Sequence, residues 1–438
     1  MRLFLSISIA IFAAFAGADP LPRKGTLGIP LRAVPDAVRQ QEKLEAQEAL
    51  QVASAANGLE TNDLITGVDG KRFKSFGEWN ELVRSAVDKS TVKLNVRRQG
   101  KEQVVEVKVQ PKPADNGSNY QTLYESVVSN GHRIRTFITK PTAPGKRPVM
   151  FWIQGINASS VETPLTGPNG MSKILKSFSD DGWVTVRVEK PGVGDSEGGP
   201  ALFVGFDEEL DIYRQTLKVL GNYDFIDASR IYIFGHSMGG CHAPIVAAEH
   251  PVKGIITYGT VPDSWLEWQI KAARVQGPLA GQTRAEIDRE VRKTVAVYHY
   301  LYNEKRTIDW IKKNHPELEP VISQTSADGV MMGVRSIKYM QEVNDKNFCD
   351  YWSKLTSTGV LALFGECDWI SLRSCQEQVA TAVNAAHPGL AEFQVVPNSD
   401  HGFYNTASFQ DSFDKWGKPG SQFNPEIISI MKKWIQDH

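Results

Sequence analysis

From residue 121 onward the chain alternates short apolar runs with helical stretches. Near-continuous apolar runs are typical of strands that are covered on both faces, and helices between them are typical of a parallel sheet. The predicted strands are residues 129–139, 149–153, 184–188, 231–234, 255–258, 360–364 and 393–396. A closing helix is predicted to run to about residue 436, with Asn424 as N-cap and Pro425 in its first turn. The pattern predicts an α/β fold with helices on both faces of a mostly parallel sheet.

Residues 20–113 follow a different pattern and predict a small α+β domain. Two stretches, 36–55 and 76–87, have helical character, and two alternating segments, 91–97 and 103–109, are predicted to be strands joined by a short connection. Residues 114–120 are polar and predict a linker to a larger domain at 121–438.

The first 18 residues have the pattern of a cleavable secretory signal. Arg2 precedes an apolar run from Leu3 to Phe15, and small residues lead up to Ala18. We therefore expect a protein that is cleaved near Ala18 and is secreted or periplasmic. Its 49 basic and 50 acidic side chains nearly cancel, so we expect no nucleic-acid partner. No segment after the first 18 residues is apolar over a spanning length, so we expect no stable membrane insertion.

The four cysteines can form up to two disulfides in an oxidising compartment. Cys367 and Cys375 lie close in sequence and are the predicted pair, whereas Cys241 is expected to be a small buried hydrophobic residue. No Cys or His pair has the spacing of metal ligands, so no metal is expected.

The segment Ile231-Tyr232-Ile233-Phe234-Gly235-His236-Ser237-Met238-Gly239 contains the most informative motif. A strand pattern leads into Gly-x-Ser-x-Gly, and a helix pattern follows. A serine at such a sharp turn has a strained backbone that exposes its hydroxyl, and glycines are needed where a Cβ would collide with neighbouring backbone. Ser237 is therefore the candidate nucleophile.

A serine nucleophile needs a histidine base, and the histidine needs a carboxylate that holds its tautomer. His401 follows the last predicted strand, and Asp368 follows the strand before it. Glu366 and Asp400 are alternative acids, although Asp400 adjoins His401 and reaches its ring with difficulty. His236 and His242 flank the serine and are interpreted as packing residues.

Residues 262–354 interrupt the alternation and are mostly helical. An insertion at this point would form a cap over the serine. Its stripe of Trp265, Leu266, Trp268 and Ile270 either lines an acyl pocket or belongs to the core, and such stripes belong more often to cores.

With these motifs in order, residues 121–438 resemble the α/β-hydrolase superfamily, near its capped esterase and prolyl-oligopeptidase-like branches. The stretch from Glu189 to Gly198 matches the glycine-rich loop of that family, and Gly155 matches its His-Gly oxyanion element, with Gln154 in place of the histidine. The resemblance implies that the backbone N–H groups of Met238 and Ile156 hold the oxyanion.

Residues 20–113 resemble a bacterial-type PDZ domain through a Leu-Gly-Ile loop, a Gly-Leu-x-x-x-Asp-Leu-Ile segment and a closing hairpin. The resemblance implies that the loop of Leu27, Gly28 and Ile29 receives the carboxylate of a peptide C-terminus. Pro30 removes one backbone donor beside this loop. The alternative is that the domain only packs against, or covers, the catalytic domain.

Taken together, the sequence predicts a serine hydrolase that cleaves carboxylic esters through an acyl-enzyme and needs no cofactor. A peptidase or an acyltransferase would use the same residues. A further alternative, from another class, is a peptide-binding protein with an inactive hydrolase domain.

Overall fold

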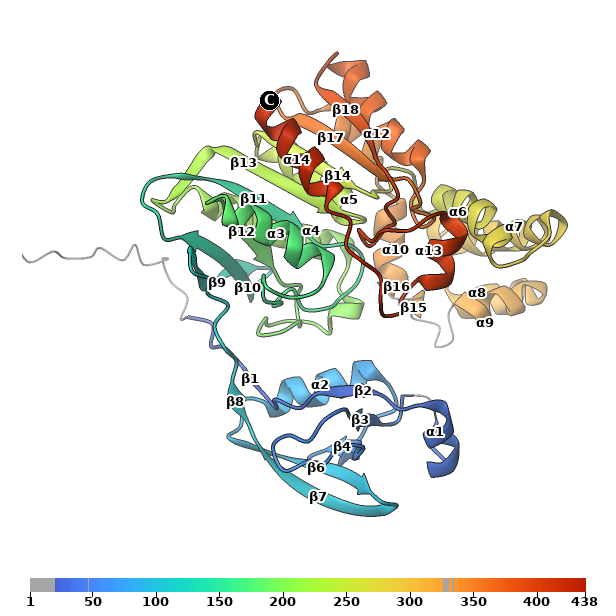
Figure 1. Ribbon diagram of the computed structural model, residues 1–438. Helices are drawn as coiled ribbons and strands as arrows, with labels where there is room; N and C mark the ends of the chain where they lie inside the picture. The colour runs from blue at the N-terminus through green and yellow to red at the C-terminus, as the bar shows by residue number, and fades with distance from the viewer. Residues whose placement is uncertain (1–19, 46, 326–330, 333–334) are drawn as a thin grey trace, which may run out of the picture.

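The computed structural model describes residues 20–438, apart from residues 46, 326–330 and 333–334. The fold has a smaller body near the N-terminus and a larger one that contains the rest of the chain (Figure 1). The predicted secretory signal lies outside the described residues. Within the described ranges, no helix is long and apolar enough to cross a membrane.

The smaller body contains an antiparallel sheet with the strand order β2-β3-β4-β6-β7. Its elements are β1 (Gly25–Thr26), β2 (Leu31–Ala33), α1 (Asp36–Glu42), β3 (Leu50–Val52), β4 (Leu64–Val68), β5 (Lys71–Arg72), α2 (Phe76–Ala86), β6 (Thr91–Arg98), β7 (Lys101–Lys108) and β8 (Gln110–Pro111). Pairing of β1 with β8 brings the two ends of this body together. The predicted second helix and the two closing strands are confirmed.

The predicted helix at 36–55 is wrong in its second half. Helix α1 ends before Lys43, which adopts a left-handed φ of 53°, and the chain then continues into strand β3. Val52 in this strand is completely buried, and the strand pairs with β2 and β4. Burial between two neighbouring strands outweighed the helical composition of the segment, because propensity is weaker than tertiary packing.

The larger sheet has the order β18-β17-β14-β13-β11-β12-β10-β9, with β9 and β10 antiparallel at one edge and the others parallel. Its strands are β9 (Tyr120–Ser129), β10 (His132–Pro141), β11 (Arg147–Ile153), β12 (Val184–Val188), β13 (Ile226–His236), β14 (Gly254–Tyr258), β17 (Gly359–Gly365) and β18 (Ala391–Val396). The prediction of one strand at 129–139 is wrong at its start, because Asn130 and Gly131 form a hairpin turn with φ of 49° and 80°.

Helices cover both faces of this sheet, as predicted. One layer contains α3 (Gly170–Asp180) and α14 (Glu426–Asp437), and the other contains α4 (Phe206–Leu220), α5 (Gly239–Glu249) and α12 (Arg373–Ala386). Successive residues of a strand point to opposite faces of the sheet. Ile233 packs against the layer of α4, α5 and α12, and Phe234 packs against the layer of α3 and α14. The short helix α13 (Phe409–Lys415) and the one-turn helix η1 (Ala201–Phe203) lie in connections.

The segment between β14 and β17 is mainly helical, as predicted. It contains α6 (Trp265–Leu279), α7 (Arg284–Tyr298), η2 (His299–Asn303), α8 (Ile308–Asn314), η3 (Pro316–Leu318), α9 (Glu319–Thr325), β15 (Met331–Met332), β16 (Arg335–Ser336), α10 (Ile337–Asn344) and α11 (Phe348–Ser353). Trp265 is buried, and its ring centroid lies 4.5 Å from that of Trp268. Both tryptophans pack in the main core with Leu266, so this part of the stripe is core.

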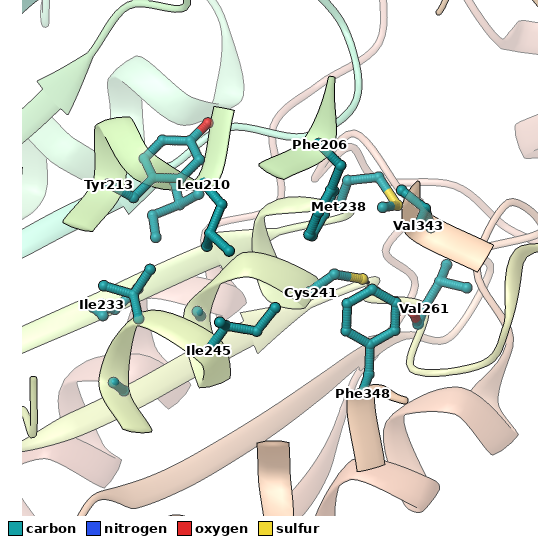
Figure 2. Packing of buried hydrophobic residues seen from close by; sticks show 14 of the residues in the cluster. Phe206, Leu210, Tyr213, Ile233, Met238, Cys241, Ile245, Val261, Val343 and Phe348 are labelled. Atoms are coloured by element: carbon teal, nitrogen blue, oxygen red, sulfur yellow. Dashed lines mark hydrogen bonds between the residues drawn. The ribbon is translucent and has the colours of Figure 1, made fainter. Parts of the chain in front are cut away.

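The insertion is anchored in the core of the larger body beside the serine turn. Figure 2 shows Met238 and Cys241 of that region among Phe206 of α4, Val343 of α10 and Phe348 of α11. Cys241 is 1% exposed, in agreement with its interpretation as a small buried residue. The packing joins the cap to the helix that follows the candidate nucleophile.

The two bodies meet at a buried carboxylate, Asp195. Its oxygens accept from the Nε atom of Arg135 at 3.0 Å, from the backbone N of Lys24 at 3.0 Å and from the Nζ atom of Lys112 at 3.3 Å. Lys24 and Lys112 come from the two ends of the smaller body, whereas Arg135 belongs to β10. Asp195 therefore fixes the start and the end of the smaller body to the larger one.

Candidate active site

Ser237 occupies a strained turn between β13 and α5. Its φ is 55°, in the left-handed region, and its backbone N donates to the carbonyl of Tyr258 at 2.9 Å. A methyl group on Gly239 would lie 2.0 Å from the Ile153 carbonyl oxygen, and one on Gly235 would lie 2.7 Å from the Cα of Gly240. The predicted need for both glycines is therefore confirmed, and the half-buried serine side chain stands at the carboxyl end of the strand.

Asp368 and His401 meet through a hydrogen bond. The Nδ1 atom of His401 lies 2.8 Å from Oδ2 of Asp368, and the carboxylate is 1% exposed. Asp368 also accepts from the backbone N of Ile370, and from the backbone N and the hydroxyl of Ser371, over 2.6 to 2.9 Å. Because a carboxylate only accepts, Nδ1 carries the proton and Nε2 is left as the basic nitrogen.

The two alternative acids are directed elsewhere. Glu366 is exposed and accepts from the backbone N of Asn398 at 2.8 Å. Asp400 accepts from the backbone N atoms of Gly402 and Tyr404, so it closes the turn on which His401 stands. Burial raises the pKa of the Asp400 carboxyl. Of the three candidates, Asp368 is the one that the structure brings to the imidazole.

Direct contacts fix the histidine loop to the serine turn. The Nε2 atom of His236, the residue before the serine, lies 2.9 Å from the His401 carbonyl oxygen. Burial lowers the pKa of His236 to about 3, with a further lowering by His401, so its ring is neutral and donates from Nε2. The hydroxyl of Tyr258 donates to the Asp400 carbonyl at 2.6 Å. His236 is thus a packing residue, as predicted, and its hydrogen bond also holds the His401 backbone in place.

Gly259 makes room for Asp368 and His401, and the sequence did not reveal this. Its φ is 64°, and a methyl group there would lie 2.8 Å from Cε1 and Nδ1 of His401 and 3.0 Å from Oδ2 of Asp368. The only sequence signal is a glycine directly after a buried strand.

The candidate oxyanion loop lies against the other side of the serine. A methyl group on Gly155 would come within 3.1 Å of Cβ and 3.6 Å of Oγ of Ser237. Gln154, which replaces the expected histidine, donates to the Asn157 side chain at 2.7 Å and to the Ser159 carbonyl at 3.0 Å. These two hydrogen bonds of Gln154 hold the loop that contains Ile156 in place.

Buried charges lie beneath this loop. Glu189 accepts from the Ser160 hydroxyl at 2.5 Å and from the Val161 backbone N at 3.1 Å, and burial raises its pKa to about 7. The next residue, Lys190, contacts the Gly155 carbonyl and Glu209. The sequence placed both residues at the start of the glycine-rich stretch but did not predict that they contact this loop, although a charged pair directly after a buried strand was a signal for such a role.

An aromatic group lies on the outer side of His401. The Trp416 ring centroid is 6.2 Å from that of His401 and 5.7 Å from that of Trp369, and Trp369 also contacts Phe413 at 5.0 Å. Trp416 is 42% exposed, so the group presents apolar surface next to the base.

The predicted disulfide is wrong, because the four cysteines are free thiols. Cys367 lies after β17 with its Sγ 3.7 Å from the Thr406 carbonyl, whereas Cys375 belongs to α12 and faces Asp263 at 3.4 Å. Proximity in sequence did not bring the two sulfurs together because a turn and the start of a helix separate them. In the part of the chain that the structure describes, no group of three or more His, Cys, Asp or Glu side chains could hold a metal.

The loop of Leu27, Gly28 and Ile29 lines a cleft of about 1250 Å³ between the two bodies. The opposite wall includes Ser159 and Ser160 of the larger body, together with η1. The Pro30 carbonyl accepts from Ala53 at 2.8 Å, so this residue faces β3. In an extended residue the N–H and C=O groups lie on the same side of the strand. The N–H that Pro30 lacks would therefore face β3, and the open edge of β2 loses no donor.

A strained serine turn at a strand end, a histidine and a carboxylate on the two later strand connections, and helices on both sheet faces define an α/β hydrolase; a PDZ domain precedes it. The sequence model described as "Serine aminopeptidase, S33" matches residues 169–405, more than half of the chain. The chain belongs to this family of hydrolases. The PDZ domain model matches residues 27–109.

Individual relatives are distant. Over 120 residues the chain is 23% identical to the quorum-quenching protein AidA of Acinetobacter baumannii (strain MDR-ZJ06), and the match covers 27% of this chain and 37% of AidA. The chain thus spans little more than a third of that relative. The structure of Est1E from Butyrivibrio proteoclasticus is similar with a TM-score of 0.44 and 13% identity, over 73% of this chain and 98% of Est1E. Acetyl xylan esterase 1 from Thermoanaerobacterium sp. JW/SL YS485 has a TM-score of 0.39 and 15% identity, over 65% and 80% of the two chains.

Proposed function

We propose that this hydrolase cleaves carboxylic esters through an acyl-enzyme on Ser237, with His401 as base and Asp368 as its partner. The observation that carries the proposal is the 2.8 Å hydrogen bond between the side chains of Asp368 and His401. The loop of His401 is itself hydrogen-bonded to His236, the residue before Ser237. This arrangement supplies a nucleophile, a base in the required tautomer and a carboxylate that stabilises the imidazolium. No cofactor takes part.

In the first half of the reaction, Ser237 Oγ attacks the ester carbonyl while Nε2 of His401 takes the hydroxyl proton. The negative charge of the tetrahedral intermediate is held by the backbone N–H groups of Met238 and Ile156. His401 then returns the proton to the leaving alkoxide, and the acyl group stays on the serine. Water repeats these steps on the acyl-enzyme, which releases the acid and restores Ser237.

The surroundings of His401 support an apolar ester as substrate. Trp369, Phe413 and Trp416 form an aromatic surface beside the imidazole, where an acyl or alcohol group would lie. Such surface favours apolar groups over charged peptide ends. The secretory pattern in residues 1–18 further supports action outside the cytoplasm.

Hydrolysis of 4-nitrophenyl esters of increasing acyl length, beside aminoacyl and dipeptidyl 4-nitroanilides, tests the proposal. Ester turnover that disappears in Ser237→Ala would support it and would also measure the length of the pocket. Amide turnover dependent on Ser237 would instead favour a peptidase, the activity in the printed family name. Acyl transfer to an added alcohol, measured in the same assay, would favour an acyltransferase. No Ser237-dependent turnover with a folded protein would contradict the proposal.

Peptide capture by the PDZ domain is a second candidate function, and the cleft beside Leu27, Gly28 and Ile29 favours it. The cleft is also lined by the basic side chains of Lys24, Arg72 and Arg84, which suit a carboxylate, and by Glu81, which pairs with Arg84 at 2.9 Å. A library of fluorescent C-terminal peptides, each compared with its C-terminal amide, tests this proposal. Binding that requires the free carboxylate would support it, whereas equal binding of acid and amide, or none, would contradict it.

A further inference from the structure

The buried ammonium of Lys190 has an acceptor for each of its three N–H donors. It donates to the carbonyl oxygens of Gly155 at 2.6 Å and Asn157 at 2.7 Å, and it forms an ion pair with Oε1 of Glu209 at 2.6 Å. The side chains of Lys190 and Glu209 are 1% and 0% exposed. An ammonium has three donors, so this site is built for the protonated lysine.

The cluster extends into the cap. The second carboxylate oxygen of Glu209 forms an ion pair with Arg335 of β16, which also donates to the Ala201 carbonyl at 3.0 Å. The Tyr213 hydroxyl donates to Glu209 at 3.2 Å. Three segments that lie far apart in the sequence therefore supply one closed network of buried charges.

The position of Lys190 matters because of the peptide unit that it contacts. The Gly155 carbonyl and the Ile156 N–H belong to the same planar trans peptide, in which the two groups point in opposite directions. A donor fixed at 2.6 Å from the carbonyl oxygen thus sets the direction of the N–H. Gly155 itself lies against Ser237, where a methyl group would be 3.1 Å from the serine Cβ.

We propose that Lys190 is a positioning residue for the oxyanion site: its ammonium orients and polarises the Gly155–Ile156 peptide, and Glu209, held by Arg335 of the cap, keeps Lys190 in place. This inference rests on the proposed function of Ser237 and Ile156. In a chain of hydrogen bonds each bond strengthens the next, so a charged donor on the carbonyl makes the N–H a better donor to a developing oxyanion.

Two features of the cluster agree with this role. Burial, with a further lowering by Arg335, holds the pKa of Lys190 below its usual range, and Glu189 raises it only in part. The geometry nevertheless suits the protonated form, because the Glu209 carboxylate and two carbonyl oxygens accept all three of its N–H donors. A buried ion pair adds little net stability over apolar residues of the same size. Apolar side chains could fill the space of Lys190 and Glu209. The role in positioning the Gly155–Ile156 peptide explains why charged residues are there instead.

The test compares Lys190→Met with Arg187→Met in the full chain. Arg187 is a control because it is a buried cation on β12, three residues before Lys190, and it donates to the carbonyls of Thr163 at 2.5 Å and Val161 at 3.4 Å rather than to the Gly155–Ile156 peptide. Three quantities are measured: kcat and KM for the best 4-nitrophenyl ester, the affinity for phenylboronic acid, which forms a tetrahedral adduct with serine, and Tm.

Lys190→Met should lower kcat and phenylboronic acid affinity together by on the order of 100-fold, as expected for the loss of one oxyanion donor. KM should stay within about threefold, because the loss falls on the tetrahedral state. Arg187→Met should lower Tm at least as much while kcat and boronate affinity change by less than about threefold, since only stability is involved.

Unchanged kcat and boronate affinity in a folded Lys190→Met would overturn the inference. If that variant does not fold, Glu209→Gln replaces it, because the amide oxygen keeps an acceptor for Lys190 while the charge is lost. A parallel drop in kcat and boronate affinity would support the inference, and a change in Tm alone would overturn it. Wild-type protein without Ser237-dependent turnover would overturn the proposed function as well, so the two failures are distinguishable.

Discussion

The two sides of Ser237 are built in different ways. On the histidine side, short connections after neighbouring strands bring Asp368 and His401 together, and the contacts are mostly between a side chain and nearby backbone. On the oxyanion side, the buried side chains of Glu189 and Lys190 form hydrogen bonds with the loop that contains Ile156. The difference shows that the loop of His401 is held mainly by backbone groups and neutral side chains, including His236 and Tyr258 from distant segments, whereas the candidate oxyanion loop is held by buried charged side chains.

The largest expected effect is on the histidine side. Asp368→Asn should lower kcat by roughly 10⁴-fold with the fold intact, because the amide can hold the imidazole in the wrong tautomer. Steady-state ester hydrolysis together with a circular dichroism spectrum checks this prediction. Glu366→Gln is the control and should change kcat less than about threefold, since Glu366 is exposed and bonded to Asn398. Near-wild-type turnover in Asp368→Asn would move the role of the acid to Glu366 or Asp400.

The second prediction concerns Gly259, whose lack of a side chain leaves space for His401 and Asp368. Gly259→Ala would place a methyl group 2.8 Å from Nδ1 of His401, so the base must shift. We expect kcat to fall by about 100-fold, as for a misplaced catalytic group. Gly182→Ala is the matched control, with a φ of 79° and no atom within 4 Å of the added methyl. It should cost about 1 kcal/mol of stability with kcat unchanged. Equal kcat in the two variants would contradict the predicted crowding.

The third and smallest effect concerns the stability of the oxyanion side. Burial raises the pKa of Glu189 from 4.5 to about 7, so the folded protein holds this proton more tightly than the unfolded chain. Its contribution to stability is fully present below about pH 4.5 and is lost as the pH rises through about 7. Glu189→Gln removes this dependence, so the Tm of the variant relative to wild type should rise between pH 5 and about pH 7.5.

The measurement is Tm by differential scanning calorimetry at several pH values. His236, on the histidine side, has its pKa lowered to about 3 by burial, which removes stability as the pH falls from 6.5 toward 3. It is present in both proteins, so its effect cancels in the difference. A difference in Tm that does not change with pH would show that Glu189 is ionised throughout.

Local patterns in the sequence predicted the order of the candidate residues on the histidine side. The order of Ser237, Asp368 and His401, each after an apolar run, follows from strand periodicity and turn chemistry, and both depend on neighbouring residues. The choice among three acids did not follow from periodicity, because it depends on the direction in which each carboxylate points. The turn at Asn130 and Gly131 carried a local signal for a hairpin that the strand prediction overlooked.

Tertiary structure alone decided which charged side chains hold the candidate oxyanion loop. Lys190 lies in the glycine-rich stretch from residue 189 to 198, but Glu209 and Arg335 are far from it in sequence, and no motif indicates that the three side chains meet. The free thiols of Cys367 and Cys375 and the strand β3 were likewise settled by packing. The sequence by itself determined the strands, the serine turn and the PDZ domain, because those depend on local periodicity. The partners of buried charges depend on which surfaces come together, and folding decides that.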